Sequence, residues 1–346
     1  MIVSADKNMR FYNSTDLKHW EYLSQFGEGY GVQPNQFECP DFIQLPVDGD
    51  KNHMKWVMIV NINPGCPFGG SATEYFVGEF DGKEFKCDND KSVTKWLDFG
   101  KDHYATVCFS NTGDRTIAVP WMSNWQYANA TPNLQYRSAN ALPRELSLYT
   151  KDGEIYMAAN AVKETQGLRK GTTTIADIDL KDEYTVNPMK TGPEGACELE
   201  MDITPNNADT VGFALLNDKG EKVDIYLDLK GGRIVMDRTQ SGITDLSRYG
   251  EVTVHAKETD DHRKKLSVNY VNDFALGTWA PLSLCNGKTY HLDVFVDKCS
   301  IEIFVDGGRI AMTNLVFPTA PYSALRFYSK DGEAQIKNLN IYQLSL

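Results

Sequence analysis

Residues 36–42 read QFECPDF and place a glutamate and a cysteine side by side at the start of a strand-like run. A carboxyl group such as that of Glu38 can give or take a proton when a protein positions it beside a substrate. Acidic residues are, however, mostly exposed in folded proteins. The simplest alternative is therefore that Glu38 is a solvated charge at the edge of a sheet. Other features of the sequence have to decide between a catalytic Glu38 and a solvated one.

The composition of the 346 residues is that of a globular chain, with 41% hydrophobic and 24% charged residues. This length favours two domains, with one large β domain as the alternative. The formal net charge of −12 argues against nucleic acid or an anionic membrane as a partner. No apolar run approaches the roughly 20 residues of a membrane-spanning helix, and the start MIVSADKN lacks the pattern of a signal peptide. The compartment stays open, because the glycosylation sequons at 13–15 and 129–131 matter only in a secreted chain.

Sequence motifs for metals and cofactors are missing. The seven cysteines contain no CxxC pair and the six histidines show no ligand spacing, so we expect neither a zinc site nor a dense disulfide framework. Residues 48–52 resemble the opening of a calcium loop, but Ile59 occupies the position of the glutamate that such a loop needs. Phosphate-binding glycine loops, HExxH and GxSxG are also not found. The sequence therefore predicts no metal and no cofactor.

Short strands separated by turn signals run through the whole chain, without any long helical periodicity. Before residue 160 they group into units of about fifty residues with four strands each, which is typical of β-propeller blades. From residue 195 the segments alternate apolar and polar residues, as in a β-sandwich. We therefore predict an all-β chain with domains at 1–160 and 195–346, joined by a connection at 161–194. The predicted strands are 1–5, 9–12, 21–24, 41–47, 54–62, 74–80, 83–87, 103–110, 115–122, 145–149 and 155–159, followed by the alternating segments, among them KLSVNY at 265–270.

Several segments resemble glycoside hydrolase family 32, which contains invertases, inulinases and levanases. Glu38-Cys39-Pro40, preceded by Gln36, is similar to the acid/base motif of that family. Further segments follow in the family's order along the whole chain, so the resemblance does not depend on one tripeptide. These segments are 61–65, 69–71, 75–78, 98–105, 121–127, 143–148 and 291–308.

The resemblance implies a five-bladed β-propeller followed by a β-sandwich, and retaining hydrolysis of β-fructofuranosides. It implies that Glu38 is the proton donor, while a second carboxylate about 5–5.5 Å away attacks the anomeric carbon. The expected partner is a fructan or a sucrose-like carbohydrate, and full-length relatives are often exported. The substrate-binding residues that the resemblance implies are Asp98, Lys101, Trp121, Gln36 and Asn63.

Most of these residues also have a purely structural interpretation. Asp98 and Lys101 could form an exposed charged turn. Trp121 could be a core aromatic, and Asn63 could simply open an Asn-Pro-Gly turn. Cys39 is expected to be a buried neighbour of the acid/base glutamate and not a nucleophile.

Two motifs of the family are not found in these 346 residues, namely the WMNDPNG-like nucleophile segment and the Arg-Asp-Pro segment. We therefore expect a partial propeller, with blades one and two missing, whose open edge could drive self-association. Asp41 would face away from Glu38 on a regular strand, so we do not expect it to replace the nucleophile. The sequence thus predicts a β-fructofuranosidase-type hydrolase that is inactive as the isolated chain. The alternative is a non-catalytic fructan-binding or vestigial module.

Overall fold

The computed structural model describes residues 1–33, 35–133, 135–250 and 273–345. β-Strands dominate these residues, with short 3₁₀ turns such as η1 (Lys163–Leu168) between them. The prediction of an all-β chain is therefore confirmed, although the predicted strand at 265–270 lies outside the described residues. Within the described residues, no helix has the length and apolar character needed to cross a membrane.

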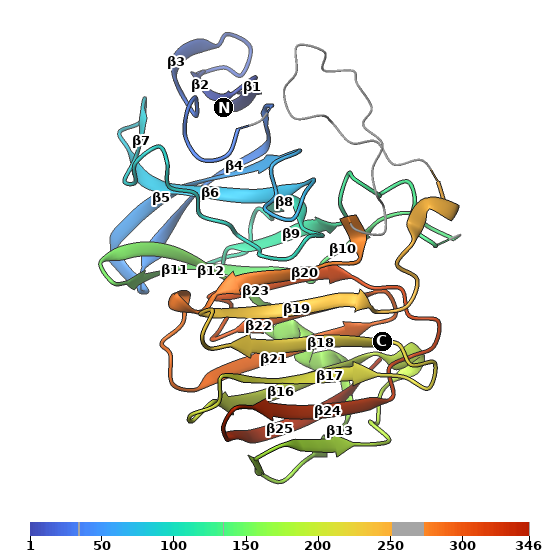
Figure 1. Cartoon of the computed structure of the whole chain (residues 1–346). Coiled ribbons are helices and arrows are strands. Elements are labelled where there is room, and N and C mark those ends of the chain that lie inside the picture. The colour runs from blue at the N-terminus through green and yellow to red at the C-terminus, as the bar shows by residue number, and fades with distance from the viewer. Residues whose placement is uncertain (34, 134, 251–272, 346) are drawn as a thin grey trace. The chain divides into compact units, whose positions relative to one another are not determined.

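The described chain forms two compact bodies, of which the first comprises residues 1–128 and 138–159. This body is built mostly from antiparallel strands, with one parallel strand pair (Figure 1). The opening sheet is β1 (Ile2–Ala5), β2 (Asn8–Asn13) and β3 (Glu21–Phe26). The next meander is β4 (Phe37–Val47), β5 (Asp50–Ile62), β6 (Ala72–Phe80) and β7 (Phe85–Cys87). The last group is β8 (Tyr104–Cys108), β9 (Ile117–Met122), β10 (Ala139–Asn140), β11 (Arg144–Lys151) and β12 (Glu154–Ala161).

Strand β5 is a central strand of the first body and is packed on both faces. Val57 and Ile59 belong to one apolar cluster, whereas Met58 and Val60 belong to a second one. Successive side chains of a strand point to opposite faces of its sheet, so one nearly continuous apolar run can supply both clusters. The polar residue Asn61 ends this run and is nevertheless fully buried.

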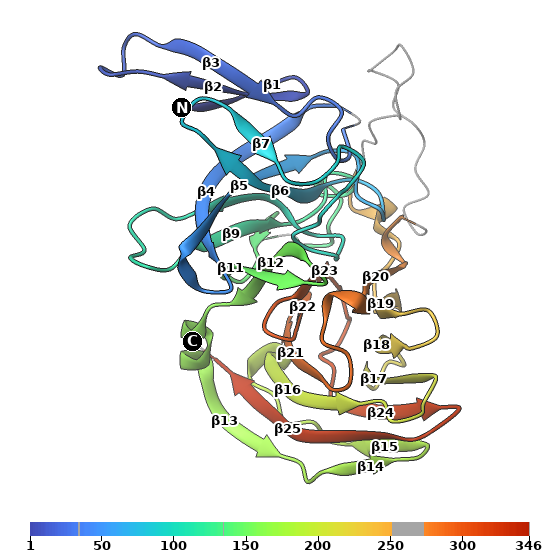
Figure 2. The ribbon, with the colours of Figure 1, turned by 90° about the vertical axis from the view of Figure 1, so that its left-hand side faces the viewer.

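The second body comprises residues 129–137, 160–250 and 273–345 of the described chain. It is a β-sandwich, and Figure 2 shows its two sheets as separate layers. The first sheet contains β13 (Arg169–Thr174), β25 (Ala334–Leu344), β16 (Cys197–Thr204), β21 (Tyr290–Asp297), β22 (Ser300–Val305) and β23 (Ile310–Leu315) in that order, with β14 (Ile178–Leu180) beside β25. The second sheet has the order β15 (Glu183–Val186), β24 (Ala324–Lys330), β17 (Thr210–Leu216), β18 (Lys222–Asp228), β19 (Arg233–Gln240) and β20 (Gly277–Pro281).

Residues 161–194 differ from the connection that the sequence predicts, because three short strands of the sandwich lie there. Strands β13 and β14 pair with β25, and β15 pairs with β24. The sequences RKGTTT and EYTV offer few apolar residues, and their side chains are largely exposed. Backbone hydrogen bonds to long partner strands hold such edge strands in place, and a search for apolar alternation does not detect them.

Candidate active site

Glu38 lies on β4 in the first body and faces Asn61 of β5 in the strand register. Its carboxyl oxygen Oε1 accepts a hydrogen bond of 2.7 Å from Nε2 of Gln36. Glu38 is half-buried, and within the described chain its second oxygen, Oε2, has no hydrogen-bond partner. The amide of Gln36 therefore fixes one carboxyl oxygen and leaves the other available to a ligand.

A β-bulge follows Glu38 directly. Glu38 pairs with Asn61 and Asp41 pairs with Ile59, so three steps along β4 correspond to two steps along β5. Cys39 carries the irregularity with a positive φ of 44°. A residue other than glycine is strained in this region, and such strain clusters at functional sites. Our prediction of a buried Cys39 is wrong, because the bulged residue is exposed.

The bulge also removes the reason for which we set Asp41 aside. One extra residue resets the alternation of the strand, so regular alternation no longer directs Asp41 away from Glu38. The hydrogen bonds of Asp41 give a different reason. Its Oδ2 accepts the backbone N–H of Cys108 at 2.6 Å, and its Oδ1 accepts that of Phe42 at 2.9 Å. Asp41 thus ties β4 to β8 through Oδ2, while Oδ1 accepts a hydrogen bond within β4, so both oxygens are already engaged.

A buried polar network connects the bulge with the segment after β7. Nδ2 of Asn61 donates to the carbonyl oxygen of Cys39 at 3.1 Å, and its Oδ1 accepts the hydroxyl of Thr73 at 2.6 Å. Nδ1 of His103 lies 3.1 Å from the same hydroxyl. Burial lowers the pKa of His103 to about 3, so its ring is neutral and can accept as well as donate.

Asp98 forms a buried ion pair with Arg144 next to this network. Arg144 Nη1 lies 2.7 Å from Asp98 Oδ2, and each side chain is 1% exposed. The N–H of Gly100 donates to Asp98 Oδ1 at 2.7 Å. Burial raises the pKa of Asp98, but the Arg144 guanidinium, His103 and the N–H of Gly100 together outweigh burial and hold this pKa below its usual value.

Lys101 is completely buried as well. Its Nζ donates to the carbonyl oxygen of Phe68 at 2.7 Å and lies 5.7 Å from the centre of the Tyr127 ring. The alternative interpretation of Asp98 and Lys101 as an exposed charged turn is therefore wrong. Both residues belong to the buried framework of the first body.

Asn63, just after β5, and Trp121, on β9, are both half-buried. Hydrogen bonds connect the loop of Asn63 with the segment that follows β9. The hydroxyl of Ser71 donates to Asn63 Oδ1 at 3.3 Å and accepts the backbone N–H of Trp125 at 3.1 Å. The rings of Trp121 and Trp125 lie 5.1 Å apart between centroids. Trp125 is 46% exposed, so this aromatic pair reaches the surface.

The predicted residues thus fall into three groups: Gln36 with Glu38, Asp98 with Lys101, and Asn63 with Trp121. The side chain of Glu38 shares a hydrogen bond only with Gln36 in the described chain, and the polar network leads from its bulge toward the second group. The connecting residues that sequence reasoning did not single out are Asn61, Thr73, His103 and Arg144. Polar residues at the ends of apolar strand runs were the available signal for Asn61 and Thr73.

Two family models match the chain along nearly its whole length. The model for "Glycosyl hydrolases family 32 N-terminal domain" matches residues 1–159, and the model for "Glycosyl hydrolases family 32 C terminal" matches residues 164–343. The chain belongs to glycosyl hydrolases family 32. The resemblance found in the sequence is thereby confirmed.

Relatives within this family include a levanase, an invertase and an exo-inulinase. A levanase of Bacillus subtilis is 32% identical over 348 residues, which cover 99% of this chain and 48% of the levanase. An invertase of Debaryomyces hansenii is 45% identical over 375 residues, covering 100% of this chain and 64% of the invertase. The crystal structure of an exo-inulinase from Aspergillus awamori matches with a TM-score of 0.80 at 27% identity, over 98% of this chain and 62% of that chain. The family 32 chain described here thus spans between 48% and 64% of the length of these three relatives.

Proposed function

We propose that Glu38 is the proton donor in the hydrolysis of a β-fructosidic bond. The observation that carries this proposal is that Oε2 of the half-buried Glu38 carboxyl group is free of hydrogen bonds within the described residues. Gln36 holds the other oxygen, Oε1, by a hydrogen bond, and the strained bulge at Cys39 follows directly. A carboxylic acid placed in this way can protonate a leaving glycosidic oxygen. Relatives named levanase, exo-inulinase and invertase support a fructan or a sucrose-like carbohydrate as the substrate.

The remaining predicted residues receive proposed roles from their contacts. Gln36 orients the acid, and the partly exposed Trp121 with its neighbour Trp125 offers an aromatic surface on which sugar C–H groups can pack. Asp98 and Lys101 are proposed to position the site without contacting the sugar, because Asp98 is paired with Arg144 and Lys101 donates to the carbonyl oxygen of Phe68.

Retaining hydrolysis also needs a carboxylate opposite the acid, about 5–5.5 Å from it. Both oxygens of Asp41 accept backbone N–H groups, and Asp98 is paired with Arg144, so neither is suited to attack a sugar carbon. The two aspartate motifs of the family are not found in residues 1–346. We therefore propose that residues 1–346, purified by themselves, hold the acid without the nucleophile and release no fructose at an enzymatic rate.

The first experiment measures fructose release from sucrose, inulin and levan by purified residues 1–346. No turnover above the Glu38→Gln variant is expected. Turnover at an ordinary enzymatic rate that Glu38→Gln abolishes would show that a carboxylate of these residues serves as the nucleophile. The absence of turnover together with measurable inulin binding that Trp125→Ala weakens would favour the binding-module alternative for the isolated chain.

A second experiment tests the role of Glu38 in a longer chain in which a segment with both aspartate motifs precedes Met1. Glu38→Gln is expected to lower kcat/KM, which reports the first, acid-assisted step, by about 10²–10⁴-fold on sucrose, the usual contribution of a general acid. The loss should be much smaller on an aryl β-fructoside, because its leaving group departs without protonation. Glu84→Gln changes an exposed glutamate of the same body and should leave both rates unchanged. Equal losses on the two substrates would refute the proton-donor role.

A further inference from the structure

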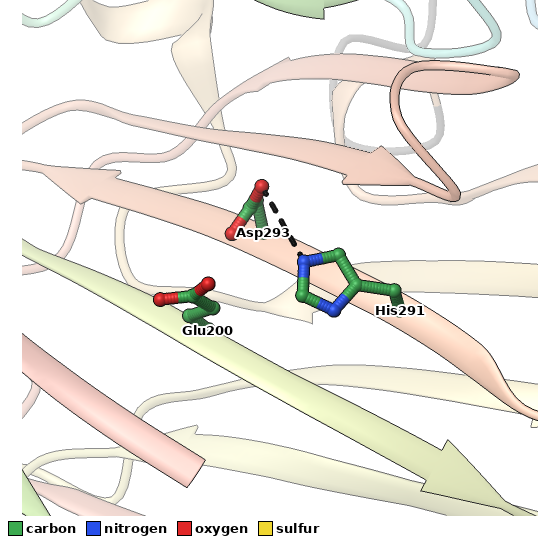
Figure 3. Close-up of side chains that lie close together, drawn as sticks. All are labelled: Glu200, His291 and Asp293. Carbon is green, nitrogen blue, oxygen red and sulfur yellow. Dashed lines mark ion pairs between the residues drawn. The ribbon is translucent and has the colours of Figure 1, made fainter. Parts of the chain in front are cut away.

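Glu200, His291 and Asp293 gather on one face of the first sandwich sheet, on the neighbouring strands β16 and β21 (Figure 3). Glu200 is the register partner of Asp293, and Asp202 is that of His291. Residues two apart on a strand share a face, so these four side chains project from the same side of the sheet. The residues between them, Met201 and Leu292, face the opposite way and are buried.

The possible ligand atoms of the three side chains lie close together. One atom from each residue lies within 4.8 Å of the other two. Nε2 of His291 is 3.9 Å from Oδ2 of Asp293, which is too long for a hydrogen bond. Two atoms bound to one zinc ion at about 2.1 Å can be at most about 4.2 Å apart. Small side-chain rotations would therefore bring the three ligand atoms within coordination distance of one ion. The three side chains are between 24% and 42% exposed, so an ion can reach them from solvent.

Neighbouring residues hold two of these ligands in a suitable orientation. Oδ1 of Asp202 lies 2.8 Å from Nδ1 of His291, which favours a proton on Nδ1 and leaves the lone pair of Nε2 toward Asp293. The hydroxyl of Tyr342 donates to Oε2 of Glu200 at 2.6 Å. Carboxylate–histidine contacts of this kind are the usual support of metal-bound imidazoles.

Asp293 and the local charge provide an independent indication of a cation. Oδ1 of Asp293 is buried and accepts no hydrogen bond in the described part of the chain, which is costly for a carboxyl group. The carboxylates of Glu198, Glu200, Asp202 and Asp293 are close together. Arg169 is a positive side chain among them; it is bound to Glu198 at 2.7 Å and 2.5 Å, and its Nη2 also lies 3.7 Å from Oε2 of Glu200. The cluster therefore keeps an excess of negative charge.

We propose that Glu200, His291 and Asp293 bind a divalent transition-metal ion, with Zn²⁺ as the best fit. Imidazole is a poor ligand for Ca²⁺ and Mg²⁺, which prefer oxygen atoms alone, whereas one imidazole with two carboxylates suits zinc. Three protein ligands leave a fourth position for water or another small ligand. The ion ties β16 to β21 and stabilises the sandwich, independently of the hydrolase chemistry proposed for the first body.

Isothermal titration of the full chain after removal of metals by a chelator tests this site. One equivalent of Zn²⁺ is expected to bind, at least tenfold more tightly than Ca²⁺ or Mg²⁺. His291→Gln and Asp293→Asn should each weaken zinc binding at least tenfold, while far-UV circular dichroism confirms that both variants fold. Co²⁺ gives a second measurement, because its visible absorption reports ligand binding directly and should disappear in the same variants.

Two control variants separate this cluster from other histidines of the chain. His19 lies 2.6 Å from Asp16 but is strongly exposed, and His19→Gln should leave zinc binding unchanged. The double variant His255→Gln/His262→Gln should also retain it. Three outcomes would overturn the proposal. Zinc binding could survive His291→Gln, it could be lost in the double variant, or it could be undetectable at millimolar zinc.

Discussion

Glu74 of β6 provides a sharp test of how burial controls stability in this protein, and we predict that its replacement by glutamine alters the pH dependence of unfolding. Glu74 is 0% exposed. The N–H of Val32 donates to Oε2 at 3.2 Å, whereas Oε1 is buried without a hydrogen-bond partner among the described residues. Burial raises the pKa of Glu74 to about 8 from its usual 4.5. The folded protein therefore keeps this carboxyl group protonated at neutral pH.

The sign and size of the effect follow from proton linkage. Between pH 4.5 and 8 the native state holds the proton of Glu74 and the unfolded state has released it. Stability falls with rising pH wherever the unfolded state binds fewer protons, by about 1.4 kcal/mol per pH unit for one group. Ionisation of Glu74 thus lowers the free energy of unfolding by on the order of 5 kcal/mol between pH 4.5 and pH 8. His103, with its pKa lowered to about 3 from 6.5, has the opposite effect below pH 6.5, so the fall should be clearest between pH 6.5 and 8.

The assay is urea unfolding of the full chain at intervals between pH 6.5 and 8.5. The free energy of unfolding should fall more steeply with pH in the wild type than in Glu74→Gln, and Glu84→Gln should follow the wild type. Glutamine leaves a buried amide partly unsatisfied, which costs about 1–3 kcal/mol at every pH, so the slope and not the absolute value is the result. Equal slopes for the wild type and Glu74→Gln would refute a neutral Glu74.

Three further predictions concern the buried framework of the candidate site. Asp98→Asn removes the carboxylate that pairs with the buried guanidinium of Arg144 and should lower the free energy of unfolding by about 3–5 kcal/mol in urea titrations. Because the pKa of Asp98 is lowered in the folded state, its stabilising effect is complete above its unfolded pKa of 3.8 and is lost as pH falls through the folded value. The free energy of unfolding should therefore fall less steeply below about pH 4 in Asp98→Asn than in the wild type. Gly70→Ala places a Cβ 1.9 Å from Oδ1 of Asn124 at a φ of +76°, and we expect a loss of at least about 2 kcal/mol in thermal unfolding.

Matched surface variants control these predictions. Asp114, which pairs with Lys51 at the surface, is 90% exposed in its side chain, so Asp114→Asn should change stability by less than about 1 kcal/mol. Gly82 has a φ of +93°, but a Cβ at this position would meet no described atom within 4 Å, so Gly82→Ala should cost only the backbone strain of about 1–2 kcal/mol. Losses in Asp98→Asn or Gly70→Ala no larger than those of their controls would contradict the roles assigned to the ion pair and to the close packing.

The all-β class, most strand positions and the family could be predicted from the sequence alone. Strand β5 illustrates why. Its apolar residues are consecutive in the sequence, and side chains on an extended backbone alternate between the two faces with a period of two residues. The Glu38-Cys39-Pro40 motif was likewise recognisable because its residues are adjacent in the chain. Patterns of this kind are local, and the sequence displays them completely.

The contacts of these residues, in contrast, depend on the tertiary structure. The bulge at Cys39 requires the pairing of β4 with β5, and it removes the regular alternation from which the facing of Asp41 was predicted. Arg144 reaches Asp98 across 46 residues, and His291 reaches Asp202 across 89. Strand register and sheet order bring such pairs together, and both are set by long-range backbone hydrogen bonds and by the burial of apolar faces. Spacing along the chain carries no trace of them, which is why the histidine positions alone gave no indication of the proposed cluster of Glu200, His291 and Asp293.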